Sequence, residues 1–124
     1  MPYTFEIQDK GDYLLLTASG TLDSIDELVS VGRSMRKKAA QCECRRFLID
    51  ERAVDKTIDP HDITVFAEAR VENPAGWLRV AVVCSPENLP GLRWVETFFQ
   101  NRSLPYRQFP SLQEAEEWLL SSRP

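Results

Sequence analysis

The stretch Arg45-Arg46-Phe47-Leu48-Ile49-Asp50 decides the fold that we predict for this chain of 124 residues. Its short apolar run, in which strand-forming residues predominate, predicts a central β-strand. We expect this strand to end at Asp50-Glu51-Arg52, where consecutive polar residues indicate a loop. In open α/β sheets, ligands bind in the crevice at the carboxyl ends of the strands. The loop after Asp50 is therefore the first place to look for a site.

The segments before this strand predict a hairpin followed by a helix. Turn residues separate two stretches whose apolar side chains recur with the spacing of strands, and the second stretch ends at Ser19-Gly20-Thr21. Ser24 and Glu27 then form the pattern of a capping box, which is typical of a helix start. In this part of the chain we expect strands over residues 3–8 and 13–18 and a helix over residues 23–40.

The segments after the central strand alternate between helical and strand patterns. Asp59-Pro60 places an N-cap residue before a proline at the first helical position, and Ser111 with Glu114 repeats the capping box. The continuous apolar run Val80-Ala81-Val82-Val83 is typical of a strand that is covered on both faces. We expect helices over residues 59–71 and 89–101 and from residue 111 onward, a turn at 73–76, and strands over 77–84 and 104–109.

This order of elements predicts an α/β fold with one mostly parallel sheet of about five strands and with four helices, in the order ββαβαβαβα. The first strand is the expected antiparallel member, because a hairpin joins it to the second. A chain of 124 residues is long enough to bury its own core without metal ions or disulfide bonds. We therefore expect a single domain over residues 1–124.

Charge and composition exclude several classes of protein. The formal net charge of −4 and the isoelectric point near 5.0 argue against a general binder of nucleic acids or anionic membranes. No segment approaches the roughly 18 unbroken apolar residues that a membrane span needs, and the N-terminus lacks the apolar core of a signal peptide. The cysteines Cys42, Cys44 and Cys84 are an odd number and fit a reducing compartment. We expect a cytoplasmic protein.

Three stretches resemble the STAS-like proteins, and most of all their SpoIIAA-like branch of small stand-alone bacterial domains. Arg46-Phe47-Leu48-Ile49-Asp50 resembles the central strand of the family, which ends in an acidic residue. Leu78-Arg79-Val80-Ala81-Val82-Val83 resembles the next strand, and residues 106–119 resemble the last strand and a helix that closes on Trp118-Leu119. This resemblance covers nearly the whole chain. It implies a non-enzymatic α/β domain that acts mainly by binding a protein partner.

One motif of the family differs in this sequence. The resemblance implies a kinase as partner and a phosphorylated serine as switch, in an Asp-Ser-Ser-Gly-like motif at the start of the helix after the central strand. The corresponding region here reads Thr57-Ile58-Asp59-Pro60-His61-Asp62 and contains no serine. Thr57 is the nearest hydroxyl, but it precedes the helix cap. We therefore expect a regulatory or interaction module without the usual phosphorylatable serine.

Candidate residues for a ligand or a partner collect in the loops that we predict at the carboxyl ends of the strands. They are Asp50, Arg52, Asp59, His61, Cys84 and Ser85. His61 is the one histidine of the chain, and beside Asp59 and Asp62 it could take part in acid–base chemistry. A solvated residue in the first turn of a helix explains it better, because the helix dipole favours carboxylates at that end.

Catalysis and metal binding find little support in the sequence. A single histidine without a partnered nucleophile argues against a catalytic triad. Cys42 and Cys44 are separated by one residue, whereas two residues separate the cysteines of common zinc sites. The acidic residues between positions 50 and 62 are better explained as a solvated loop and a helix cap than as a cation site. We expect no enzymatic activity, no metal ion and no cofactor.

The helix predicted over residues 89–101 carries more apolar surface than one face of a sheet needs. Leu92, Val95 and Phe99 can face the sheet, which leaves Trp94 and Phe98 on an adjoining flank. Two interpretations remain open for this flank. It is either covered by further core, or it forms an exposed aromatic surface for a protein partner or a second copy of the chain.

Three functional hypotheses follow. The first is a STAS-like module that binds a protein partner, or itself as a homodimer, through Trp94, Phe98 and the loops at the strand ends. The alternative is a carrier or sensor of a small apolar or anionic ligand, held between the helices and the sheet. The third is an enzyme that uses the acidic cluster with His61.

Overall fold

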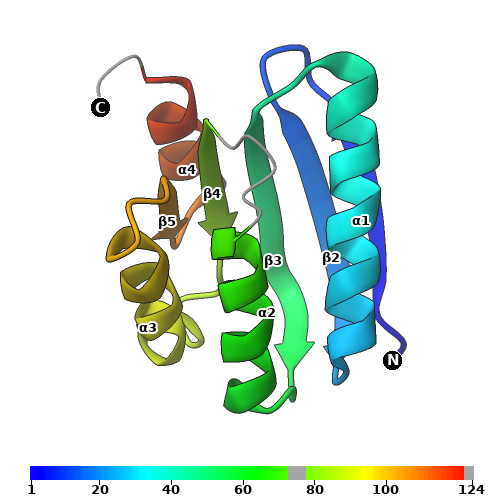
Figure 1. Cartoon of the computed structure of the whole chain (residues 1–124), viewed down its shortest axis with the longest axis vertical. Coiled ribbons are helices and arrows are strands. Elements are labelled where there is room, and N and C mark those ends of the chain that lie inside the picture. Colours follow the sequence, from blue (N-terminus) through cyan, green and yellow to red (C-terminus); the bar gives the residue numbers. More distant parts are fainter. Residues whose placement is uncertain (73–77, 122–124) are drawn as a thin grey trace.

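A computed structural model describes residues 1–72 and 78–121, without the side chains of residues 70–72. These residues form one five-stranded sheet with helices on both of its faces (Figure 1). The elements are β1 (Thr4–Asp9), β2 (Leu14–Leu22), α1 (Ile25–Cys42), β3 (Arg46–Lys56), α2 (Pro60–Glu72), β4 (Arg79–Val83), α3 (Leu89–Gln100), β5 (Tyr106–Phe109) and α4 (Leu112–Leu120). The predicted order of strands and helices is confirmed.

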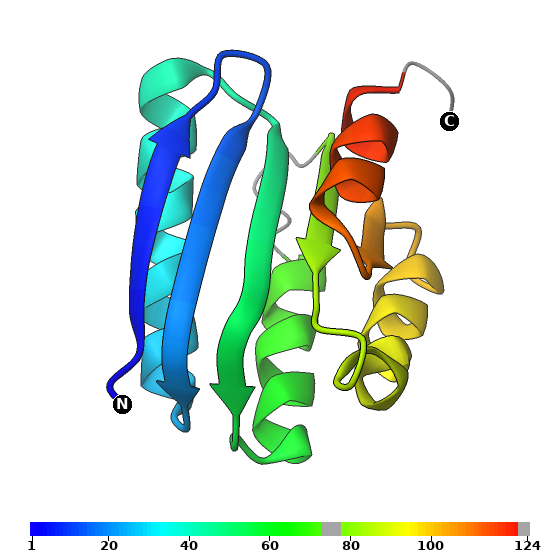
Figure 2. The ribbon, with the colours of Figure 1, turned by 180° about the vertical axis from the view of Figure 1, so that it is seen from behind.

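The strands lie in the sheet in the order in which they occur along the chain. β1 runs antiparallel to β2, and every later pair is parallel. Because each βαβ crossover is right-handed and each moves in the same direction, α1, α2 and α3 all cover one face. We call this the front face, and the face that carries α4 the rear face (Figures 1 and 2). The predicted mostly parallel sheet with one antiparallel strand is confirmed.

The predicted end of the central strand at Asp50 is wrong, because β3 continues to Lys56. Ala53 to Lys56 pair with Ser19 to Leu22 of β2, which also extends beyond its predicted end. A register shift marks a bulge in β3, where one extra residue lies between Asp50 and Ala53. The polar side chains do not interrupt the strand, because the hydrogen bonds between strands are made by backbone groups. β2 is long enough to pair with β3 as far as Lys56.

The helix starts follow the sequence patterns. The side chains of Ser24 and Ser111 accept hydrogen bonds from the backbone N–H groups of Glu27 and Glu114. The side chain of Asp59 accepts one from the backbone of His61 at the start of α2. The turn predicted at 73–76, and Trp77 at the start of the predicted strand, lie outside the described residues. Within the described part of the chain, no helix is both long and apolar enough to cross a membrane.

Alternation along the strands divides the core between the two faces. All five residues of β4 are buried, as expected of a strand that is covered on both sides. Val80 and Val82 belong to the front core, which β2, β3, β4 and α1 share, whereas Ala81 and Val83 belong to the rear core under α4. A third cluster, in which Ala67 of α2 meets residues of α3, joins these two helices.

Candidate functional site

The front face contains a cavity of about 490 Å³ between the sheet and helices α1, α2 and α3. Its walls are mainly apolar and come from four strands, β2 to β5, and from the three helices α1, α2 and α3. Representative residues are Met35 of α1, Phe47 of β3, Phe66 of α2, Val82 of β4, and Leu92 and Phe99 of α3. A partly open cavity of this size against a folded core is unusual, because protein interiors are packed as closely as organic crystals.

The position of α2 explains why the cavity exists. In the described residues, no Cα atom of α2 lies within 8 Å of a strand Cα atom. The helix is held from its sides instead, by Ala67 in the cluster with Val95 and Phe99 of α3. On the other side, a Cβ atom on Gly32 of α1 would lie 3.8 Å from the ring of Phe66. α2 therefore covers the front core without packing closely against the sheet.

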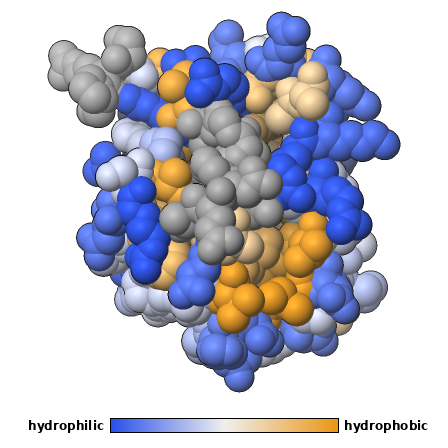
Figure 3. All heavy atoms as spheres, viewed as in Figure 1, coloured by the Kyte–Doolittle hydropathy of each residue, from blue (hydrophilic) through white to orange (hydrophobic). Residues whose placement is uncertain are grey.

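The surface over this face is partly apolar. Figure 3 shows hydrophobic side chains gathered low on the front of the molecule, among hydrophilic ones. Val29 of α1 and Val65 of α2 are among the exposed large hydrophobic residues. An apolar surface beside an apolar cavity is a feature that ligand sites share with other recognition surfaces.

An ion pair between Glu51 and Lys56 lies in one wall of the cavity. Residues five apart in a regular strand point to opposite faces, and the bulge in β3 adds the residue that turns both side chains to the front. Their side chains are 18% and 23% exposed. Burial acts to lower the pKa of Lys56, but the charge and hydrogen bond of Glu51 outweigh it and raise the pKa. Lys56 therefore remains a cation that is already paired.

Tyr106 and Gln108 of β5 add two neutral polar side chains to the cavity wall. Burial, followed by the nearby charge of Glu51, raises the pKa of the Tyr106 phenol, so that its hydroxyl group stays protonated. Gln108 is only 3% exposed, and its Nε2 donates to the carbonyl of Leu92 over 2.9 Å. Among the described residues, the Oε1 atom of Gln108 has no hydrogen-bond partner.

The sequence matches no family model and no curated protein. Solved structures match the fold, and two of them do so over nearly the whole chain. One is an uncharacterised protein of the DUF3478 family with a SpoIIAA-like fold, from Shewanella loihica PV-4. It is 17% identical, with a TM-score of 0.61, and the match covers 94% of this chain and 93% of that chain. The chain has a SpoIIAA-like fold. An anti-sigma factor antagonist from Mycobacterium paratuberculosis is 16% identical with a TM-score of 0.62, over 97% of this chain and 96% of that chain.

In this SpoIIAA-like fold, Asp50 and Arg52 lie away from the cavity. Asp50 pairs in register with Val83, which belongs to the rear core, so its side chain points to the rear face. Arg52 binds it through two hydrogen bonds of 2.8 and 2.9 Å. Burial acts to raise the pKa of Asp50, but these bonds and the charge of Arg52 outweigh it and lower the pKa. The two residues satisfy each other locally.

The other predicted loop residues do not converge either. Asp59 caps α2, and His61 is exposed in its first turn. Cys84 is buried in the front core, where burial raises the pKa of its thiol to about 11 and leaves it protonated at neutral pH. Ser85 follows it in the loop before α3. In residues 1–72 and 78–121, no three histidine, cysteine or acidic side chains come together as a metal site would require.

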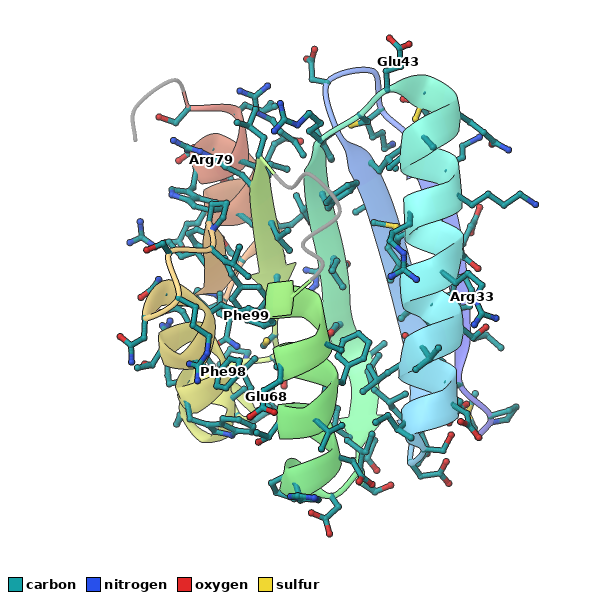
Figure 4. The ribbon with its side chains drawn as sticks, viewed as in Figure 1. Arg33, Glu43, Glu68, Arg79, Phe98 and Phe99 are labelled. Atoms are coloured by element: carbon teal, nitrogen blue, oxygen red, sulfur yellow. The ribbon has the colours of Figure 1, made fainter. Side chains whose placement is uncertain are left out.

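The aromatic flank of α3 divides into two parts. The rings of Phe98 and Phe99 meet in an edge-to-face arrangement with ring centres 5.7 Å apart, and Phe98 packs on the cluster that contains Ala67 of α2. Figure 4 shows both phenylalanines on the side of α3 that is directed toward α2. Trp94 is 37% exposed and is the part of the flank that reaches the surface.

Four polar residues of the cavity wall, Glu51, Lys56, Tyr106 and Gln108, are not among the site residues that we predicted from the sequence. We placed the end of the strand at Asp50, so the sequence pattern assigned Glu51 and Lys56 to no face of the sheet. Tyr106 and Gln108 stand two apart in a short strand. An amide at a core-facing position of a strand was the signal that could have found this site, because buried polar side chains need partners.

Proposed function

We propose that this chain is a non-enzymatic carrier or sensor that binds a small, mainly apolar molecule in the front cavity. The observation that carries the proposal is the cavity of about 490 Å³ with its apolar walls. Ligand sites typically have volumes of roughly 300–1,000 Å³, apolar walls and a few polar groups that fix orientation. A small apolar molecule would regain there the dispersion contacts that the lining residues lack.

The polar residues of the wall support binding rather than catalysis. Lys56 is protonated and paired with Glu51, and the raised pKa of Tyr106 keeps its hydroxyl neutral. A nucleophile or general base acts in its deprotonated form and needs a pKa near the working pH. His61, which the enzyme hypothesis requires, is exposed in the first turn of α2 and does not line the cavity.

Native mass spectrometry of the freshly purified protein tests this proposal. We expect a reproducible small-molecule adduct on the protein, and we expect Ala39→Phe to abolish it, because Ala39 of α1 lines the cavity. Ala69→Phe is the matched control, since Ala69 is exposed on α2 and does not line the cavity. A wild-type protein that takes up neither a cellular adduct nor an added apolar probe would overturn the proposal.

Exposure of Trp94 favours a second candidate function, a STAS-like regulatory module that binds a protein partner or a second copy of the chain. The fold neighbour named as an anti-sigma factor antagonist supports a regulatory role of this kind. Of the two aromatic residues that we predicted for this surface, only Trp94 is exposed, while Phe98 is half-buried.

Light scattering with size-exclusion chromatography tests this second candidate function. Trp94→Ser should leave a folded monomer, whereas Phe98→Ser should destabilise the domain. A wild-type assembly that Trp94→Ser leaves unchanged would remove this surface.

A further inference from the structure

Gln108 is fixed in the cavity wall in one orientation. Its backbone N–H donates to Glu96 over 2.6 Å, and its side-chain Nε2 donates to the carbonyl of Leu92. The Leu92 carbonyl can only accept, so the amino end of the amide must face it and Oε1 must point elsewhere. This oxygen is a buried acceptor without a partner among the described residues. A ligand that donates a hydrogen bond to it would remove the cost of leaving it unpaired.

Tyr106 places a hydroxyl group next to this acceptor. Its oxygen lies 3.5 Å from Nε2 of Gln108, on the side chain that carries the unpaired Oε1. Tyr106 and Gln108 both line the cavity, and the protonated phenol can donate a hydrogen bond. These two neighbouring side chains therefore offer one donor and one acceptor to a ligand. A hydroxyl group can accept from the first and donate to the second at the same time, whereas a carboxylate can only accept.

The charges around these two residues disfavour an anion. Glu51 and Glu96 both act on Tyr106 as negative charges, and Glu51 has the larger effect. Lys56, which also lines the cavity, is engaged by Glu51. A carboxylate head group beside Tyr106 would meet these like charges without a hydrogen bond to compensate at Gln108.

We infer that the cavity binds apolar molecules with a neutral hydroxyl head group, which Tyr106 and Gln108 hold between them. This inference rests on the proposed function and specifies its ligand class as alcohols or phenols. Arg36 and Arg45 line the cavity as well, near the end of α1. These two arginines are where a ligand with an anionic head group would bind instead. Comparing the affinities of a neutral alcohol and a carboxylate therefore tests which ligand class the cavity prefers.

The experiment compares 1-octanol with octanoate, which share an alkyl chain, by displacement of a fluorescent apolar probe at pH 8. We expect 1-octanol to bind at least about tenfold more tightly, a difference that one buried hydrogen bond can produce. Gln108→Leu and Tyr106→Phe should each weaken binding of 1-octanol by about threefold to tenfold and leave octanoate unchanged. Tyr106→Phe removes only an oxygen atom, so it keeps the test valid if Gln108→Leu does not fold. Gln113→Leu on the exposed surface of α4 is the matched control.

The outcomes separate the inference from the proposed function. If octanoate binds as tightly as 1-octanol or more tightly, the inference is overturned while the cavity remains a ligand site. If 1-octanol binds more tightly but neither substitution weakens it, the head group lies elsewhere and the inference is again overturned. If the probe binds but neither compound displaces it or binds directly in calorimetry, the inference alone is overturned. If the probe does not bind either, the proposed function and the inference fall together.

Discussion

The two faces of the sheet are built from the same strands but are packed differently. One helix, α4, closes the rear core so tightly that Leu48, Ala81, Ala115 and Leu119 are completely buried. Three helices cover the front (Figures 1 and 2). A cavity of about 490 Å³ nevertheless remains beneath them. The number of covering helices therefore does not determine how well a face is packed.

Attachment to the strands explains the difference. On the rear, the guanidinium group of Arg79 in β4 donates to the carbonyl of Trp118 in α4, and the hydroxyl group of Tyr13 donates to Glu116. Ala115, which is fully buried, lets α4 approach the sheet closely. On the front, the small residue Ala67 of α2 is turned to α3 instead of to a strand. A helix that is fixed to its neighbouring helices can stand off from the sheet.

The largest effect should come from truncating one leucine on each face. Leu119→Ala on the rear should lower the free energy of unfolding by about 2–5 kcal/mol, because it creates a cavity in a close-packed core. Leu28→Ala on the front should cost less than half of that, since Leu28 is half-buried and already borders the cavity. Urea unfolding of both variants measures the difference. Equal losses would show that the front core is as tightly packed as the rear.

Two arginines with the same kinds of contact give the next comparison. Arg79 donates to the backbone carbonyl of Trp118 and lies over the ring of that residue. Arg102 makes the same two contacts with Phe98. Arg79 is buried and Arg102 is exposed. Arg79→Met should cost about 1.5–3 kcal/mol, as expected for a buried hydrogen bond to a charged group. Arg102→Met should cost less than about 0.5 kcal/mol. Thermal melting of both variants measures these losses of stability. A large loss for Arg102→Met would contradict the expectation that the exposed contacts contribute little.

How much of this could be predicted from the sequence depends on the range of the interaction. Local patterns predicted the caps at Ser24 and Ser111, the order of the elements and the faces of β4, because each depends on residues that are near in sequence. The end of β3 could not be predicted in this way. Residues 53–56 are held in the strand by β2, more than thirty positions earlier, and a bulge leaves no local pattern.

The candidate site was harder to predict than the fold for the same reason. The cavity depends on how far α2 stands from the sheet, and helical spacing carries no information on that distance. The spacing of Trp94 and Phe98 correctly placed both on one flank of α3, but only the position of α2 decides that Phe98 is half-buried while Trp94 is exposed. The six loop residues were chosen because loops at strand ends often bind ligands. In the structure they form local pairs, Asp50 with Arg52 and Asp59 with His61, and do not line the cavity.

Filling the two faces provides a third comparison. Ala115→Leu on the rear should cost about 1–3 kcal/mol of unfolding free energy, because a close-packed core cannot take a larger side chain without strain. Ala39→Leu on the front should change the free energy of unfolding by less than about 1 kcal/mol, since the added atoms can enter the cavity. Urea unfolding of both variants tests this. If Ala39→Leu is as destabilising as Ala115→Leu, the cavity does not accept atoms in solution.

The smallest effect concerns the hydroxyl group that fastens α4 to the rear face. Tyr13 donates to Glu116 over 2.6 Å, and burial, followed by this bond, raises the pKa of Tyr13 to about 12. Tyr13→Phe should therefore cost about 1 kcal/mol at neutral pH, the usual net value of one hydrogen bond.

The raised pKa means that the folded state holds the proton more tightly than the unfolded state, whose pKa is near 10. The contribution of Tyr13 is thus complete below pH 10 and is lost as the pH rises toward 12. Melting temperatures of the wild type and Tyr13→Phe should differ by a constant amount from pH 7 to 9 and converge above pH 10. A difference that persists at pH 11.5 would show that Tyr13 stabilises α4 by packing and not through its hydroxyl group.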